Sequence, residues 1–170
     1  MALIALSLGS NLGDRRAHLL WAVEELRRVL RNVRASEPIE TEPEGVPEPQ
    51  PPYLNMAAVG ETDAAPLDLL ATLLDLERRQ GRTRPAPRAP RTLDLDLILY
   101  GDATLDLPGL TVPHPMFRSR RFVLSPLASV APDLVDPVTG LTVRQLLDRL
   151  SEKNEGRVSS PPTRPAFPKP

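Results

Sequence analysis

The chain has 170 residues, of which 41% are hydrophobic and 25% charged, with a net charge of −1. These figures are typical of one ordinary globular domain, and the near-neutral charge argues against bulk attraction to nucleic acid or anionic lipid. The absence of cysteine excludes disulfides, thiolate metal sites and a cysteine nucleophile. No secretion signal is evident, and no stretch approaches the ~20 apolar residues of a membrane helix. We therefore expect a cytoplasmic protein that binds neither nucleic acid nor a membrane.

The N-terminal half alternates between apolar runs and segments with helical periodicity. Hydrophobic patterning and turn residues predict, in chain order, a strand at 3–8, a helix at 14–33, a short strand near 34–40, a loop at 41–52, a strand at 53–62 and a helix at 66–79. Pro66 suits the first turn of the last of these helices. The loop at 41–52 is rich in Pro and Glu, and its length is typical of a functional loop.

The C-terminal half begins with a basic loop at 78–91, which holds six arginines and no acidic residue. We then expect a strand at 92–100, a hairpin-like region at 101–112, a partly helical segment at 118–130, a helix at 142–150 with a Thr142/Gln145 capping box, and a disordered Pro-rich tail at 156–170. The order β-α-β-β-α-β predicts a ferredoxin-like α+β fold with a mostly antiparallel sheet and helices on one face. Residues 1–155 would form one domain, with the C-terminal hairpin and helices added to the core.

Two aspartates in the 92–100 strand are the first candidate for chemistry. In Leu93-Asp94-Leu95-Asp96-Leu97, alternation places Leu93, Leu95, Leu97 and Leu99 on the core face and both carboxylates on the opposite face. Their Cα atoms would be about 6.5–7 Å apart, a separation at which two carboxylates can bridge a pair of Mg²⁺ ions. A strand that merely shows two carboxylates to water is the structural alternative.

Four arginines just upstream favour the magnesium site over a strand that merely shows two carboxylates to water. Arg82, Arg84, Arg88 and Arg91 arrive at the same edge as the carboxylates. A metal–polyphosphate complex would sit naturally between the two groups, because Mg²⁺ binds carboxylates together with phosphate oxygens and Arg forks bind the remaining oxygens. Direct salt bridges between the arginines and the aspartates stay open as an alternative.

Three further features carry weaker signals. The loop from Gly9 to Gly13 joins a strand to a helix, where it could bind an anion, although capping by Asn11 or Asp14 is the simpler role. His114 is held between two prolines and could reach a phosphate. Tyr53 and Asn55 share one strand face, as recognition of a flat, hydrogen-bonding heterocycle requires, or as a partly buried cross-strand pair would.

Six motifs in a fixed order make the sequence resemble the 6-hydroxymethyl-7,8-dihydropterin pyrophosphokinase family of folate biosynthesis over residues 3–150. They are S-L-G-S-N-L-G-D (7–14), Y-L-N (53–55), L-E-x-x-x-G-R (76–82), G-R-T-R followed by R-A-P-R-T-L-D-L-D-L-I-L-Y-G (81–101), V-P-H-P (112–115) and R-R-F-V-L-x-P-L (120–127). The resemblance implies an ATP-dependent enzyme that transfers pyrophosphate to the hydroxymethyl group of the pterin and releases AMP.

The resemblance also implies roles for individual residues. Asp94 and Asp96 would bind two Mg²⁺ ions, and Arg82 and Arg91 would hold the transferring group. The ATP-binding residues would be Arg84, Arg88, His114, Arg120 and Glu77. The pterin pocket would be formed by Tyr53, Asn55, Phe122, Thr41 and Pro43.

Two other functions remain open at this stage. A ferredoxin-like sheet with a basic loop is a common RNA-binding platform, although the net charge and the 4% aromatic content do not favour it. A relative of the same fold could instead use MgATP for simple phosphoryl or nucleotidyl transfer. We expect a monomer that acts on small-molecule substrates.

Overall fold

A five-stranded antiparallel sheet forms the centre of the molecule. The computed structural model describes residues 1–41, 52–81 and 92–155. The strands follow the order β2-β4-β1-β5, with β3 pairing with β4 as well. Their bounds are β1 Ala2–Ser10, β2 Arg31–Ala35, β3 Ile39–Thr41, β4 Tyr53–Thr62 and β5 Asp94–Tyr100. The predicted ferredoxin-like α+β fold is therefore confirmed.

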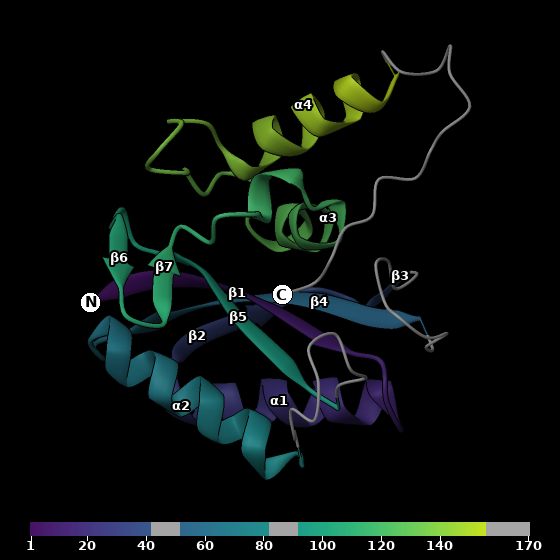
Figure 1. Cartoon of the computed structure of the whole chain (residues 1–170), viewed down its shortest axis with the longest axis vertical. Helices are drawn as coiled ribbons and strands as arrows, with labels where there is room; N and C mark the ends of the chain where they lie inside the picture. Colours follow the sequence, from purple (N-terminus) through teal and green to yellow (C-terminus); the bar gives the residue numbers. More distant parts are fainter. Residues whose placement is uncertain (42–51, 82–91, 156–170) are drawn as a thin grey trace.

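Helices cover both faces of this sheet: the two helices of the ferredoxin-like core lie on one face, as predicted, and the C-terminal helices added to that core cover the other. Helices α1 (Arg15–Val29) and α2 (Pro66–Arg79) pack on one face, while α3 (Arg121–Val130) and α4 (Val143–Glu155) lie above the other (Figure 1). The short helix η1 (Phe117–Ser119) and the hairpin β6 (Leu105–Leu107)–β7 (Leu110–Val112) connect β5 to α3. Both faces need cover because both carry buried apolar residues, in two separate core clusters.

The first helix is shorter than its apolar periodicity predicts. It begins at the N-cap Asp14, whose carboxylate accepts a hydrogen bond from the Ala17 N–H, and ends at Val29 because Leu30 is extended. Asn32 then takes a positive φ of 53°, a conformation that Asn tolerates better than most residues. The chain thus turns directly into β2, and the single strand predicted at 34–40 is two short strands, β2 and β3.

A bulge in β5 alters the predicted alternation of its leucines. Leu6 of β1 lies opposite Leu97, but Ala5 lies opposite Leu99, so Ile98 is the extra residue. Leu93, Leu95 and Leu97 pack toward α1 and α2 as predicted. Leu99 does not, because the bulge turns it into the cluster beneath α3 and α4.

The last two helices are joined by a hydrogen-bonded turn around a buried carboxylate. Asp136 is fully buried, and its two oxygens accept hydrogen bonds from the Arg118 guanidinium at 2.6 and 2.9 Å. The predicted capping box at the start of α4 is confirmed, since Thr142 Oγ1 accepts from the Gln145 N–H while Gln145 Oε1 accepts from the Thr142 N–H. These bonds fix α4 against α3.

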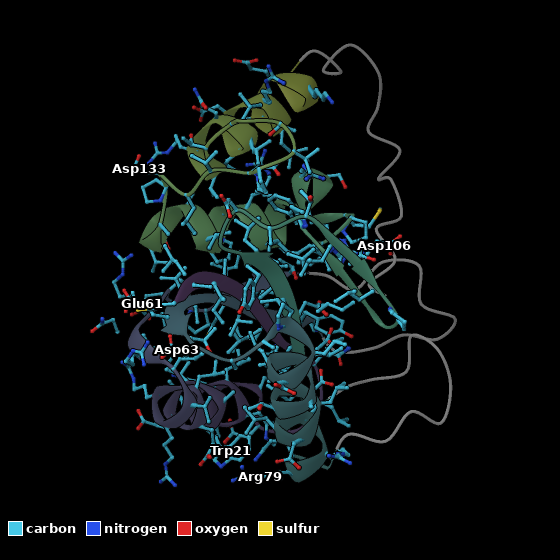
Figure 2. The ribbon with its side chains drawn as sticks, turned by 90° about the vertical axis from the view of Figure 1, so that its left-hand side faces the viewer. Trp21, Glu61, Asp63, Arg79, Asp106 and Asp133 are labelled. Atoms are coloured by element: carbon cyan, nitrogen blue, oxygen red, sulfur yellow. The ribbon has the colours of Figure 1, made fainter. Side chains whose placement is uncertain are left out.

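The outer surface of α1 and α2 is joined by one aromatic contact. The Arg79 guanidinium lies 5.2 Å from the centre of the Trp21 ring and forms an ion pair with Glu25 (Figure 2). Among the helices described, none is both long enough and apolar enough to cross a bilayer. The predicted disordered tail at 156–170, and most of the loops predicted at 41–52 and 78–91, fall on residues outside the described part of the chain.

Candidate active site

The face of the sheet beneath α3 becomes polar at one end. Along β1, Ile4, Leu6 and Leu8 pack toward α1 and α2, so alternation places Ala5, Ser7 and Gly9 on the α3 face. Gly9 lies between Asn55 of β4 and Asp94 of β5, and Ser7 lies opposite Asp96. Two carboxylates and one carboxamide therefore share this end of one sheet face, on either side of a residue without a side chain.

Asp94 is only 4% exposed, which excludes a strand that simply shows both carboxylates to water. Arg120, itself 3% exposed, lies close enough to interact electrostatically with both aspartates. Burial lowers the pKa of the Arg120 guanidinium, while Asp96 and then Asp94 raise it. The guanidinium stays charged, because arginine is not deprotonated in proteins. The site thus combines a buried cation with two carboxylates.

His114 lies near Arg120 and Asp94 and is held in one orientation. Its backbone N–H donates to the carbonyl of Ile98 in β5 at 2.9 Å, and its ring Nδ1 accepts from the Met116 N–H at 3.2 Å. Burial and the Arg120 charge lower the pKa of His114 to about 4, against the opposing effect of Asp94. The imidazole is therefore neutral at pH 7. Because Nδ1 accepts, the proton is on Nε2, which can donate to an anionic oxygen.

Phe122 lies beside the same arginine in the first turn of α3. The Arg120 guanidinium is 5.6 Å from the centre of the Phe122 ring. The next basic residue, Arg121, is exposed and donates instead to Ser151 Oγ of α4. The two consecutive arginines thus have different surroundings, one at the candidate site and one on the outside of α3.

Asn55 is held by the neighbouring strand β3. Its Nδ2 donates to Thr41 Oγ1 at 2.6 Å, and the side chain is fully buried. Thr41 lies opposite Tyr53, which is 5% exposed. The structure therefore brings these three predicted residues together on β3 and β4. A carboxamide carries both a donor and an acceptor, the combination that the edge of a hydrogen-bonding heterocycle requires.

Glu77 lies on the other side of β5 from the aspartates. It is 3% exposed, and Oε2 accepts a hydrogen bond of 2.8 Å from the backbone N–H of Leu95, the residue between Asp94 and Asp96. Next to it, the Thr92 hydroxyl donates to the carbonyl of Gln80, whose side chain also bonds to His18. The end of α2 is thereby fixed to the start of β5, which positions both aspartates.

The two carboxylates fit a magnesium ion that takes its other ligands from water and phosphate. They do not fit a metal whose ligands all come from the protein. Within residues 1–41, 52–81 and 92–155, no three or more His, Cys, Asp or Glu side chains gather as a metal site. Mg²⁺ commonly uses one or two carboxylates and takes its remaining ligands from water and phosphate oxygens. Asp94 and Asp96 at alternate positions of one strand match that requirement.

Five of the predicted site residues cannot be placed, since they lie outside the described part of the chain: Arg82, Arg84, Arg88, Arg91 and Pro43. The sequence predicted Gly9 as the start of a loop, whereas it lies within β1, and it gave no separate role to Ser7. A signal for them was present, because 4–9 alternates large and small residues, Ile-Ala-Leu-Ser-Leu-Gly. A strand whose large side chains all lie on one face leaves room for a ligand above its other face.

Comparison with known proteins identifies the family to which this sequence is similar. The family model described as 7,8-dihydro-6-hydroxymethylpterin-pyrophosphokinase matches residues 5–132. A Synechocystis protein named 2-amino-4-hydroxy-6-hydroxymethyldihydropteridine pyrophosphokinase is 43% identical over 145 residues, covering 84% of this chain and 73% of that protein. A Pseudomonas aeruginosa protein of the same name is 44% identical over 133 residues, covering 77% of this chain and 82% of the relative.

Among solved structures, the Plasmodium falciparum HPPK-DHPS crystallised with pteroate is similar in fold, with a TM-score of 0.72 and 15% identity. The match covers 94% of this chain but only 44% of the Plasmodium chain, so this chain spans less than half of that protein. The resemblance predicted from the six motifs is confirmed. The chain belongs to the 7,8-dihydro-6-hydroxymethylpterin-pyrophosphokinase family.

Proposed function

We propose that this protein transfers the β,γ-pyrophosphoryl group of ATP to the hydroxymethyl group of 6-hydroxymethyl-7,8-dihydropterin, giving AMP and the pterin diphosphate. The hydroxymethyl oxygen forms a bond to the β-phosphorus of ATP. The bond between that phosphorus and the oxygen shared with the α-phosphate breaks, and the hydroxyl proton passes to solvent. Family membership supports the substrates, and the polar end of the sheet supports the placement of each.

The observation that carries the proposal is the row Asn55, Gly9, Asp94 across three neighbouring strands. Strands lie about 4.8 Å apart, so the carboxamide and the first carboxylate start about 10 Å from each other with no side chain between them. Asn55, Tyr53 and Phe122 would bind the pterin at one side. At the other side, the aspartates would bind the triphosphate of ATP through magnesium. The two substrates would then lie next to each other above Gly9.

Positioning and charge neutralisation are the main requirements of phosphoryl-type transfer. Asp94 and Asp96 would hold two Mg²⁺ ions. Bound to ATP, these ions neutralise charge on the phosphates and fix their orientation. Arg120 supplies a buried positive charge beside them, and the neutral His114 supplies the Nε2–H donor. The motifs assign Arg82 and Arg91 to the transferring group and Arg84 and Arg88 to the nucleotide.

Glu77 has two candidate roles in this scheme. The motif resemblance assigns it to nucleotide binding, whereas in the structure its carboxylate accepts a hydrogen bond from the Leu95 N–H, between the two aspartates. We propose that it orients the aspartates from behind the strand. Residues 1–155 would form one catalytic domain that acts as a cytoplasmic monomer on small-molecule substrates.

Product analysis tests the proposal. Purified protein is incubated with MgATP, with and without 6-hydroxymethyl-7,8-dihydropterin, and the nucleotides are separated by chromatography. AMP that forms only with the pterin supports attack at the β-phosphorus. ADP would mean simple phosphoryl transfer, and unchanged ATP with a correctly folded protein would refute the proposed activity.

A further inference from the structure

Arg15 bridges two strands at the point where the pterin-binding residues begin. Its Nη1 donates to Glu40 Oε1 of β3 at 2.9 Å and to the carbonyl of Pro52, just before β4, at 2.7 Å. Thr41 follows Glu40 in the chain and Tyr53 follows Pro52, and these two residues face each other in the β3–β4 pair. One side chain at the start of α1 therefore holds both chain segments that lead into the substrate-binding residues.

This bridge acts from the opposite face of the sheet. Leu54, the β4 partner of Glu40, packs with the cluster toward α1 and α2. Alternation therefore places Thr41, Tyr53 and Asn55 on the α3 face, where the candidate pocket lies. Arg15 belongs to α1 and contacts β3 from the face that α1 and α2 cover. It is thus separated from the pocket by the sheet itself and acts through other residues.

The pair of strands needs such support. β3 has three residues, and among the described strands it pairs with β4 alone. A ladder of three residues supplies few backbone hydrogen bonds to hold the two strands in register. Arg15 is partly buried, with 28% of its side chain exposed, and hydrogen bonds from a charged group are stronger than neutral ones.

We propose that Arg15 is a positioning residue for the pterin side of the site. By holding Glu40 and Pro52 together, it keeps Thr41 beside Asn55, where the Thr41 hydroxyl accepts the Asn55 amide proton at 2.6 Å. The carboxamide is then oriented before substrate arrives. This inference rests on the proposed function for the identity of the ligand, but the effect on β3 and β4 does not depend on it.

Arg15→Met removes the guanidinium and keeps an unbranched side chain that suits a helix. Arg16→Met is the matched control, because Arg16 is the adjacent and exposed arginine. The first readout is amide hydrogen exchange, which needs no substrate. We expect exchange in residues 39–41 and 53–55 to become roughly 10-fold faster in Arg15→Met and to stay unchanged in Arg16→Met. Equal exchange in the two variants would overturn the proposal.

The second readout separates positioning from general loosening. In Arg15→Met we expect the KM for the pterin to rise about fivefold, less than for loss of the Asn55 carboxamide itself, with kcat and the KM for ATP close to wild type. Arg15→Lys should restore part of the loss. Equal increases in both KM values, or no change in either, would contradict the proposal. A wild-type protein that forms no AMP would refute the proposed function alone, while the exchange experiment would still decide the role of Arg15.

Discussion

The two faces of the sheet are built from the same strands but serve different needs. Toward α1 and α2, residues such as Leu6, Leu8 and Leu97 form a continuous apolar core. Toward α3, the apolar cluster covers only part of the sheet, and the remainder carries Asn55, Asp94 and other polar groups. The face toward α1 and α2 stabilises the fold along its whole length. Because of this stability, the face toward α3 can carry buried polar groups at one end.

The largest effect should follow from loss of a carboxylate on the polar face. Asp96→Ala should reduce kcat by about 10³-fold or more, because a magnesium ligand is lost, while the melting temperature stays close to wild type. Asp106→Ala is the control, since this exposed aspartate lies on the β6–β7 hairpin (Figure 2). Near-normal turnover by Asp96→Ala would exclude a role for this aspartate in metal binding.

A substitution on the apolar face should affect stability and not turnover. Leu6 is 1% exposed, and Leu6→Ala should lower the free energy of unfolding by about 3 kcal/mol through lost burial and a cavity. Urea denaturation measures this change. Below the unfolding transition, kcat and both KM values should match wild type. A selective loss of pterin or ATP binding would show that the two faces are not independent.

The carboxylate that joins α3 to α4 should make stability depend on pH. Burial raises the pKa of Asp136, but the hydrogen bonds from Arg118, Thr139 and the Val138 N–H together outweigh it and lower the pKa below its usual value. As the pH falls, the Asp136 carboxylate is therefore protonated first in the unfolded chain, near pH 3.8, and only at lower pH in the folded protein. The ionised carboxylate stabilises the fold above this range, and that contribution is lost as the pH falls through the folded pKa.

Asp136→Asn tests that contribution. At pH 7 the variant should be about 2 kcal/mol less stable than wild type, because one acceptor oxygen facing the Arg118 guanidinium is replaced by an amide donor. Denaturation at pH 7, 5 and 3 should show the difference narrowing at the lowest pH. A constant difference across this range would mean that the Asp136 charge contributes nothing.

The smallest expected effect concerns the carboxamide. Asn55→Ala should weaken pterin binding by about 10-fold, the usual result of removing one buried hydrogen-bond partner of a ligand, and leave ATP binding unchanged. Thr41→Val removes only the hydroxyl that holds Asn55 and should give a smaller loss of the same kind. Equal losses in the two variants would mean that orientation by Thr41 matters as much as the carboxamide itself.

The sequence predicts features that depend on local pattern and fails where distant segments meet. The strand at 53–62, the helix at 66–79 and the Thr142/Gln145 capping box agree with the structure because short-range spacing determines them. Asp94 and Asp96 are found by strand alternation. The bulge that redirects Leu99 has no local signal, because it arises from pairing with Ala5 of β1.

Contacts across long sequence separations account for what was missed at the site. Glu77 is visible as a motif residue, but its bond to Leu95 depends on how α2 packs beside β5. Arg15 carries no signal at all in the sequence, because its partners are 25 and 37 residues away. The cover of α3 and α4 on the second face likewise follows from apolar residues on both faces of the sheet.

The most direct test of a site with two separate halves is calorimetric titration of Asn55→Ala and Asp96→Asn with each ligand. One titrant is the pterin, and the other is MgATP in a form that cannot react. We predict that Asn55→Ala loses affinity for the pterin alone and Asp96→Asn for MgATP alone, each relative to wild type. Equal loss of both ligands in both variants would contradict the division of the site about Gly9.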